Sequence, residues 1–332
     1  MGYTSRWRIY KVNPQTWADA DEIKGFKSAS VSRESGNLIE SGSIVIDHGE
    51  ELDECYVRIA MVASHDGANE RIDVATLLCI TSGGDWSGST ATIDGRSVLR
   101  PASTALYDYG AYCPPNVDAV QWSARELEKV LQAPVSYEGS FTLAKPMVFD
   151  LGASVLDSVR KVLESGGYTI TINGYGEVFV IPLPKEPVTT IDASNARLLM
   201  VGGETTRDYS DIPNRYTARN GKNVARAVND SIDSPVSTVS RGYRVDVLDT
   251  SPVPTGGETL QGYAERRLYE LSTVSVEETY TREWIDGINV DSVVRLGFGD
   301  TGDYRVTAQD YECGEGITVT EKVTKEVALW TR

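Results

Sequence analysis

The sequence has few of the residues that most often bind metals or carry acid–base chemistry. It contains two histidines and four cysteines among 332 residues. No two cysteines form a Cys-x-x-Cys pair and no histidine lies near a cysteine; the six residues are His48, His65, Cys55, Cys79, Cys113 and Cys313. Structural zinc sites usually use closely spaced ligand pairs. We therefore expect no metal site, and we expect the cysteines to be free, buried thiols.

Long apolar runs are also absent. No run approaches the roughly 20 apolar residues of a membrane-spanning helix. The first residues of the chain contain no apolar segment of the kind found in secretory signal peptides. These absences predict a protein that has no membrane span and is made and folded in a cytoplasm.

Positive charge is scarce. Lys and Arg number 32 against 48 Asp and Glu, and the formal net charge is −16. Tight binding to nucleic acid needs clustered Lys and Arg that face phosphates, so the charge balance argues against it. Two interpretations stay open: an acidic surface that keeps the protein soluble, or a surface or channel that must not bind polyanions.

Most sequence motifs of enzymes are missing. There is no Gly-x-x-x-x-Gly-Lys-Ser/Thr phosphate loop and no Gly-x-Ser-x-Gly nucleophile elbow. Neither histidine has a matching nucleophile and carboxylate in a recognisable context. Gly174-x-Gly176 lies in a predicted hairpin rather than between a strand and a helix, so it is no dinucleotide fingerprint. We expect no cofactor.

Two enzymatic signals are present, and each has a simpler explanation. Asp300-Thr301-Gly302 matches the aspartic-protease triplet, but that chemistry needs two such carboxylates. The other Asp-Thr, at Asp249, is followed by Ser251 instead of glycine, and turn-forming residues explain the triplet by themselves. Glu138 and Glu177 fit the composition of a glycosidase pair, but such pairs arise freely among 48 acidic residues. We expect no enzymatic activity.

The first third of the chain is rich in strand patterns. Short alternating segments are separated by Gly, Asp, Asn and Ser turns, with no helical period between them. They span residues 7–12, 26–33, 43–47, 55–62, 72–81, 86–93 and 96–99. This pattern indicates a small β-barrel or sandwich.

The apolar period changes after residue 113. Residues 118–132 and 151–164 carry apolar side chains at helical spacing, the second series beginning with Leu151, and Gly166-Gly167 ends the second helix. A hairpin follows at residues 168–172 and 177–181. This stretch therefore predicts an α+β unit.

The strand pattern returns from residue 188 and is interrupted once. Asn220-Gly221 is a hairpin turn between two short strands, and a further strand is expected from Arg241 to Leu248. An amphipathic helix spans residues 258–272, with Thr255-x-x-Glu258 as a capping box at its start. The last strands are predicted at residues 274–280, 290–296, 304–310 and 317–327.

Short motifs in this second half resemble the baseplate hub, or tail-tip hub, proteins of tailed bacteriophages. The order of these motifs along the chain also resembles that in tail proteins of prophages and of phage-tail-like particles. The matching segments are Ile212-Pro-Asn-Arg-Tyr216, Asn229-Asp230, Arg241-Gly242, Asp249-x-Ser-Pro-x-Pro254 and Tyr263-Ala264. Residues 31–42 and Asp94-Gly-Arg-Ser-Val-Leu99 also resemble the opening barrel of long-tailed phage members.

The resemblance implies a mainly β fold with α+β insertions. It consists of two small β-barrel domains, the second interrupted by a helix, plus an α+β domain. For this chain the resemblance implies an N-terminal β-barrel at residues 1–113 and an α+β domain at residues 114–187. The helix of residues 250–274 is expected to join, and pack with, the α+β domain. The second β-barrel comprises residues 188–249 and 275–332.

The resemblance also implies a function. Such a structural virion protein forms a homotrimeric ring that adapts the sixfold tail tube to threefold tip components and surrounds the DNA exit channel. The implied partners are a tube-end protein hexamer, the tape-measure protein, a central fibre or spike, and DNA that passes without specific binding. The protein would be assembled in the host bacterial cytoplasm and would end without a peptidase or fibre-binding extension. A phage-associated hydrolase and a glycan-binding receptor module that uses exposed tryptophans are the alternatives.

The matching motifs yield a set of residues expected to be architectural rather than catalytic. Pro213 and Pro252 would fix φ where the chain enters and leaves the second barrel. Arg215 is expected to hold the corner by pairing with Asp208 or Asp211. The full set is Asp208, Asp211, Pro213, Asn214, Arg215, Tyr216, Arg241, Gly242, Asp249, Ser251, Pro252 and Tyr263.

Overall fold

The computed structural model describes residues 4–35, 39–47, 52–65, 68–84, 89–192, 194, 198–200, 206–250, 252 and 258–330. The chain divides into two compact units. The first consists of Met1–Val201 with Tyr280–Lys322, and the second of Gly202–Thr279 with Val323–Arg332. The fold is mainly β with α+β insertions, as the sequence predicts. No helix among these residues is long and apolar enough to cross a membrane.

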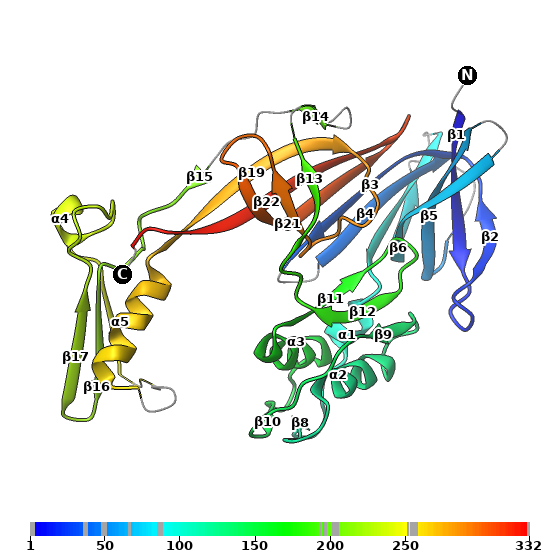
Figure 1. The fold of residues 1–332 in the computed structure, drawn as a ribbon. Helices are drawn as coiled ribbons and strands as arrows, with labels where there is room; N and C mark the ends of the chain where they lie inside the picture. The colour runs from blue at the N-terminus through cyan, green and yellow to red at the C-terminus, as the bar shows by residue number, and fades with distance from the viewer. Residues whose placement is uncertain are drawn as a thin grey trace. The chain divides into compact units, whose positions relative to one another are not determined.

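One large sheet forms the frame of the first unit (Figure 1). Its N-terminal strands are β1 (Thr4–Val12), β2 (Asp19–Ile23), β3 (Phe26–Glu34), β4 (Ile39–Asp47), β5 (Cys55–His65), β6 (Ala68–Gly84) and β7 (Thr90–Ser97). Later strands of the same sheet are β13 (Pro187–Ile191), β14 (Leu198–Met200), β19 (Thr273–Glu283), β20 (Val293–Leu296), β21 (Gly302–Cys313) and β22 (Ile317–Ala328). The main order is β14-β19-β22-β21-β3-β4-β7-β6-β5-β1-β2.

The first and last parts of the chain meet where β3 pairs with β21. The pairing is antiparallel, with Val31 opposite Tyr311. Buried residues alternate along β3 and β7 because successive side chains point to opposite faces of a sheet. These inward residues form one core that draws on both ends of the chain. Among the described strands we find no pairing that closes the sheet into two barrels, so the division into barrel domains stays a prediction.

The α+β insertion of the first unit follows the predicted order. Its elements are α1 (Arg100–Thr104), β8 (Tyr112–Cys113), α2 (Ala119–Glu128), β9 (Val135–Tyr137), β10 (Met147–Val148), α3 (Val155–Gly166), β11 (Tyr168–Ile172) and β12 (Val178–Pro182). The hydroxyl of Ser154 caps α3 by accepting from the Asp157 N–H at 3.0 Å. Gly167 ends the helix with φ of 72°. Leu151, expected at the start of the helical stripe, precedes α3 and is 73% exposed.

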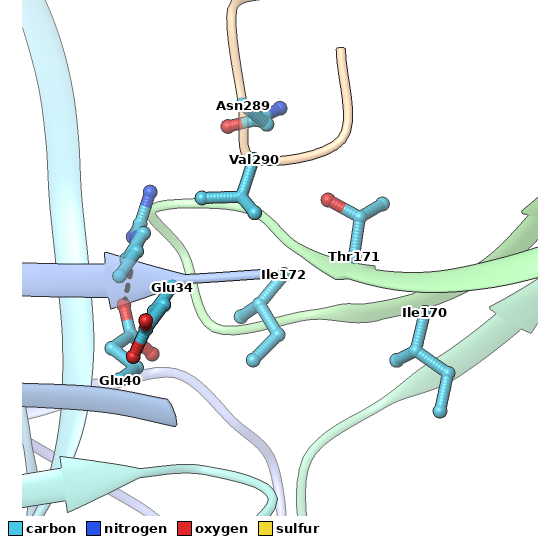
Figure 2. Close-up of a pocket in the computed structure, with 8 residues that line it drawn as sticks. Glu34, Glu40, Ile170, Thr171, Ile172, Asn289 and Val290 are labelled. Carbon is cyan, nitrogen blue, oxygen red and sulfur yellow. Dashed lines mark hydrogen bonds and ion pairs between the residues drawn. The ribbon is translucent and has the colours of Figure 1, made fainter. Parts of the chain in front are cut away.

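A small cavity lies where β11 meets the ends of β3 and β4 (Figure 2). Ile170, Thr171 and Ile172 of β11 line it together with Asn289 and Val290. Its volume of about 30 Å³ is enough for a water molecule but not for a sugar or a peptide side chain.

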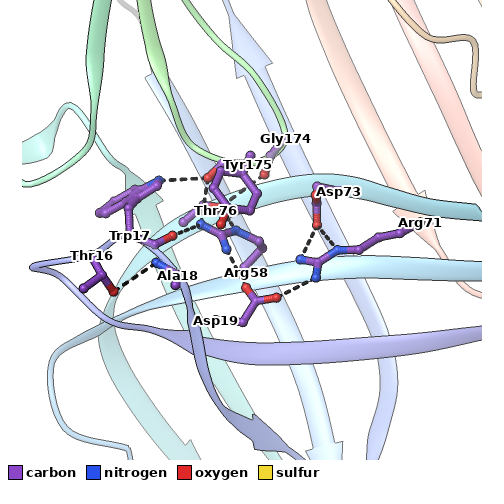
Figure 3. A network of polar contacts seen from close by, with 10 residues as sticks. All are labelled: Thr16, Trp17, Ala18, Asp19, Arg58, Arg71, Asp73, Thr76, Gly174 and Tyr175. Atoms are coloured by element: carbon purple, nitrogen blue, oxygen red, sulfur yellow. Dashed lines mark hydrogen bonds and ion pairs between the residues drawn. The ribbon is translucent and has the colours of Figure 1, made fainter.

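A buried arginine connects the insertion to the sheet (Figure 3). Arg58 of β5 has no exposed surface and pairs with Asp19 at 2.5 Å. Its guanidinium also donates to Thr76 Oγ1 and to the carbonyl oxygens of Trp17 and Tyr175, at 3.0–3.1 Å. The Tyr175 ring lies 3.4 Å from the guanidinium carbon. Because Tyr175 belongs to the turn of the β11–β12 hairpin, this network holds the hairpin on the sheet.

Glycine is required at the tip of the same hairpin. A Cβ atom at Gly174 would lie 1.7 Å from the backbone oxygen of Asp73. Only a residue without a side chain lets the turn approach the strand this closely.

The second unit contains a three-stranded sheet with one helix on it. Its elements are β16 (Arg215–Asn220), β17 (Asn223–Val228), α4 (Thr238–Arg241), β18 (Asp246–Asp249) and α5 (Leu260–Leu271). The short strand β15 (Thr206–Arg207) pairs with β19 and belongs to the large sheet. The order is β17-β16-β18, with β18 parallel to β16, and the predicted turn at Asn220-Gly221 is present with Gly221 at φ of 60°. The hydroxyl of Thr259 caps α5 by accepting from the Gly262 N–H at 3.1 Å. The capping residue predicted from sequence, Thr255, lies outside the described residues.

The helix of the second unit has a buried face that packs on β16 and β17. Tyr263, Ala264 and Leu268 of α5 form one core with Tyr216 and a set of small strand residues, Ala218, Ala225 and Ala227. We expected this helix to pack with residues 114–187. The buried face instead packs within its own unit, where the small alanines let the helix lie close to the sheet; contact with residues 114–187 stays a prediction.

Candidate functional site

The residues expected to be architectural belong to the second unit, and one of them is a buried asparagine. Asn214 is fully buried, and its amide donates to the carbonyls of Val236 and Tyr243 at 3.2 and 3.0 Å. Its side-chain oxygen accepts from the Val245 N–H at 2.9 Å. A single side chain thus satisfies three backbone groups that have no strand partner, which explains why an asparagine is needed there. Pro213, just before it, is also buried.

Arg241 and Gly242 do not begin a strand, as the sequence suggested, but end the short helix α4. Gly242 is the C-cap with φ of 70°, a conformation that favours glycine. The Arg241 guanidinium donates to the carbonyl oxygen of Ile212 at 2.8 Å and also to that of Tyr209. Arg241 therefore holds the corner around Ile212, the role that sequence reasoning assigned to Arg215.

Arg215 pairs with a different carboxylate from those we predicted. Its guanidinium makes a two-point contact with Asp246 of β18, whose Oδ2 lies 2.8 Å from Nη2. Asp208 instead accepts from both the N–H and the hydroxyl of Ser210, and these donors lower the pKa of its carboxyl. Asp211 is exposed. The parallel pairing of β16 and β18 places Asp246 opposite Arg215, a contact that sequence spacing does not reveal.

Asp249 ties the sheet of the second unit to its helix. Its Oδ2 accepts from the hydroxyls of Tyr216 and Tyr263, each at 2.8 Å. The two rings meet edge to face with their centroids 6.3 Å apart. Burial, together with the Asp249 carboxylate, raises the pKa of Tyr216 well above its usual value. Pro252 is half-buried three residues later, and Ser251 lies outside the described residues.

The face of the second-unit sheet that does not contact α5 is open. Along β17, Ala225 and Ala227 are buried while Val224, Arg226 and Val228 are exposed. Their exposed neighbours on this face are Arg219 and Leu248. We call these five exposed residues, Arg219, Val224, Arg226, Val228 and Leu248, the open face. Exposed apolar side chains interleaved with arginines are typical of a contact surface. The alternation of alanine with Val and Arg in residues 224–228 was the sequence signal for it.

The enzymatic alternatives gain no support from the geometry. Asp300 lies in the predicted turn, between β20 and β21, and its backbone oxygen accepts from the Tyr304 hydroxyl at 2.5 Å. Glu177 and Glu138 lie at opposite ends of the parallel pair β9–β12. The register offsets them by about four residues along the strands. The register therefore does not set the two side chains opposite each other.

The tryptophans do not form an exposed binding surface in the described part of the chain. Trp7, Trp17, Trp122, Trp284 and Trp330 are all buried or half-buried there. The Trp7 and Trp17 indoles donate to carbonyl oxygens of Gly314 and Tyr175. Within the same residues, no group of three His, Cys, Asp or Glu side chains is placed to hold a metal ion.

The fold was compared with known proteins. No protein-family model matches the chain, and no curated protein sequence matches it significantly. Solved structures do match over nearly its whole length. A tail protein from Neisseria meningitidis has a TM-score of 0.64 at 12% identity, covering 98% of this chain and 97% of that chain. The 43 kDa tail protein of prophage MuSo2 from Shewanella oneidensis has a TM-score of 0.64 at 14% identity, covering 96% and 97%.

This chain has the fold of phage tail proteins. A prophage tail protein from Listeria monocytogenes shares that fold with a TM-score of 0.53 at 9% identity, over 96% of this chain and 94% of that chain. At such low identity the likeness lies in the order and pairing of the elements, not in individual side chains. The resemblance stated from short sequence motifs is therefore confirmed at the level of the tail-protein fold.

Proposed function

We propose that this chain is a structural virion protein, the baseplate hub at the tail tip of a tailed phage, assembled in the cytoplasm of the host bacterium. The observation that carries this proposal is the fold match to a tail protein and to a prophage tail protein, over 98% and 96% of this chain. The contacts of Asn214, Arg241 and Asp249 agree with it, since these residues join separate segments of the second unit.

The proposed working state is a homotrimeric ring that adapts the sixfold tail tube to threefold tip components. In this proposal residues 1–113 and residues 188–249 with 275–332 are two barrel-like modules, so that three subunits present six similar modules to a tube-end hexamer. Residues 114–187 are the α+β domain between them. Contact between copies would also cover exposed strand edges, which otherwise invite aggregation.

Charge supports a second copy of this chain as the occupant of the open face. Most of the net charge of −16 comes from residues of the first unit, whereas acidic and basic residues nearly balance in the second. Arg219 and Arg226 make the open face basic, and Val224, Val228 and Leu248 provide apolar contact area. An acidic surface on the first unit of a neighbouring copy is complementary to it in charge.

Light scattering on the purified full-length chain tests both parts of the proposal. We expect a trimer at micromolar concentration, and we expect Arg226→Glu combined with Val228→Asp to yield monomers. Lys24→Glu, a charge reversal at an exposed residue of the first unit, is the control and should leave the trimer intact. A monomeric parent protein counts against a stable trimer. A trimer that survives the double substitution would instead overturn only the role of the open face.

The ring is proposed to surround the DNA exit channel, with the tape-measure protein and a central fibre or spike as further partners. An acidic channel wall repels phosphate, so DNA can pass without binding. Negative-stain images of particles labelled for this chain should place the label at the tail tip. A structure of the assembled ring with a basic channel wall would contradict the role given to the negative charge.

A further inference from the structure

Two cysteines face each other directly across neighbouring strands. Cys55 begins β5 and is paired in register with Cys79 of β6, beside the pair Tyr56 and Leu78. Directly opposed residues of an antiparallel pair have Cα atoms ~4.5–5.5 Å apart, and a disulfide needs ~4.4–6.8 Å. The thiols of Cys55 and Cys79 are already hydrogen-bonded to each other. The backbone therefore needs at most a small adjustment for a covalent link.

The two thiols differ in exposure in a way that assigns them different roles. Cys55 is half-buried and lines a surface groove of about 510 Å³ together with Pro14, Glu54 and Leu78. Cys79 is only 2% exposed and lies in the core of the large sheet. A reagent from solvent meets Cys55 first and reaches Cys79 only through it. The pairing of β6 with β7 is irregular just after Cys79, which provides local freedom for a small adjustment.

The chemical environment also distinguishes Cys55 from the other thiols. The hydrogen bond from Cys79, aided by the charge of Lys11 and opposed by burial, lowers the pKa of Cys55 to about 7. Burial raises the pKa of Cys113 to about 11 and that of Cys313 to about 12. The thiolate is the nucleophile in disulfide exchange, so Cys55 reacts at neutral pH while Cys113 and Cys313 stay protonated.

We propose that Cys55 and Cys79 form a redox-dependent cross-link, with Cys55 as the attacking thiol and Cys79 as the resolving thiol. The Cys55 thiolate attacks one sulfur of a small disulfide such as oxidised glutathione and releases one reduced glutathione. Cys79 then loses its proton and attacks the Cys55 sulfur of the mixed disulfide, which releases the second reduced glutathione. Two protein thiols are oxidised to one disulfide, and one small disulfide is reduced to two thiols.

The compartment decides which state prevails. A reducing cytoplasm keeps both thiols free, and an oxidising medium outside the cell favours the cross-link. The link would tie the start of β5 to β6 and constrain the unfolded chain between them. This chemistry follows from the strand register and does not depend on the proposed tail function.

Mass spectrometry on the full-length chain tests the proposal. Protein purified under reducing conditions is incubated with oxidised glutathione at neutral pH, and the alkylated, non-reduced peptides are mapped. We expect the parent protein to lose the mass of two hydrogens and to yield one Cys55–Cys79 peptide pair. Cys79→Ser should accumulate a glutathione adduct on Cys55, and Cys55→Ser should leave Cys79 unmodified. Cys313→Ser, the matched control, should behave like the parent.

Three results would overturn the proposal. They are a lasting glutathione adduct on Cys55 of the parent, modification of Cys79 in Cys55→Ser, and no reaction of Cys55 with oxidised glutathione. Circular dichroism checks that each variant is folded. The parent also provides a readout without any substitution. Its Tm should rise by about 5 °C on oxidation and return on addition of dithiothreitol; an unchanged Tm in protein shown to be cross-linked would mean that the link stabilises nothing.

Discussion

Replacing Arg58 should loosen the β11–β12 hairpin from the large sheet. Arg58→Ala removes a fully buried guanidinium that holds a carboxylate, a hydroxyl and two carbonyl oxygens. Breaking a buried ion pair by removing one partner costs about 3–5 kcal/mol of stability. The lower part of that range applies because Asp19 is partly exposed and keeps its second partner, Arg71. We therefore expect a loss of about 3 kcal/mol in the free energy of unfolding.

Urea denaturation measures the loss, and hydrogen exchange locates it. The amides around Tyr175, whose ring and carbonyl both contact the guanidinium, should exchange faster in Arg58→Ala. Arg58→Lys is the matched control. It keeps a positive charge beside Asp19 but cannot reach all the acceptors at once, so a loss of about 1–2 kcal/mol is expected. A loss below about 1 kcal/mol for Arg58→Ala, with unchanged exchange at the hairpin, would refute the importance of this network.

Three further predictions concern the Asp249 carboxylate, the Gly174 turn and the titration of Tyr216. Tyr263→Phe removes one of the two hydroxyls that donate to the Asp249 carboxylate, so urea denaturation should show a loss of about 1 kcal/mol in the free energy of unfolding. Tyr269 is exposed, and Tyr269→Phe should change this free energy little. Gly174→Ala brings a methyl group into the backbone of the neighbouring strand and should cost about 3 kcal/mol or more by the same measurement, whereas Gly110→Ala, whose Cβ meets nothing within 4 Å, should be neutral. Burial raises the pKa of Tyr216 in the folded state, so its contribution to stability is present below about pH 10 and is lost as the pH rises further. Urea midpoints measured across this range should fall more steeply for the parent than for Tyr216→Phe.

The elements that the sequence predicted well are those in which local pattern and burial agree. The helix α3 has the predicted apolar stripe and terminal glycine, although it begins at Val155 and not at Leu151. The hairpin at Asn220-Gly221 and the turn at Asp300 form for the same reason, since their residues favour the required backbone conformations. The predicted strand at Arg241 failed because a serine cap at Ser237 and the glycine at Gly242 favour a short helix there.

Contacts between segments far apart in the sequence were predicted less well. Arg215 was assigned to nearby carboxylates, but β18 lies beside β16 and places Asp246 at its guanidinium. The opposition of Cys55 and Cys79 likewise depends on the register of β5 and β6. A change of register by one residue would turn each side chain to the other face, and composition and spacing do not determine that register.

By itself the sequence determined the mainly β class, the α+β insertion, the turns and the resemblance to tail proteins. These depend on local conformational preference and on the period of apolar residues, which act over a few positions. Only the tertiary structure decided that β3 joins β21 in one sheet, that Asp249 receives two tyrosine hydroxyls, and that Arg58 holds a distant hairpin. The physical reason is that strand pairing and burial gain free energy from contacts whose partners are not neighbours in the chain.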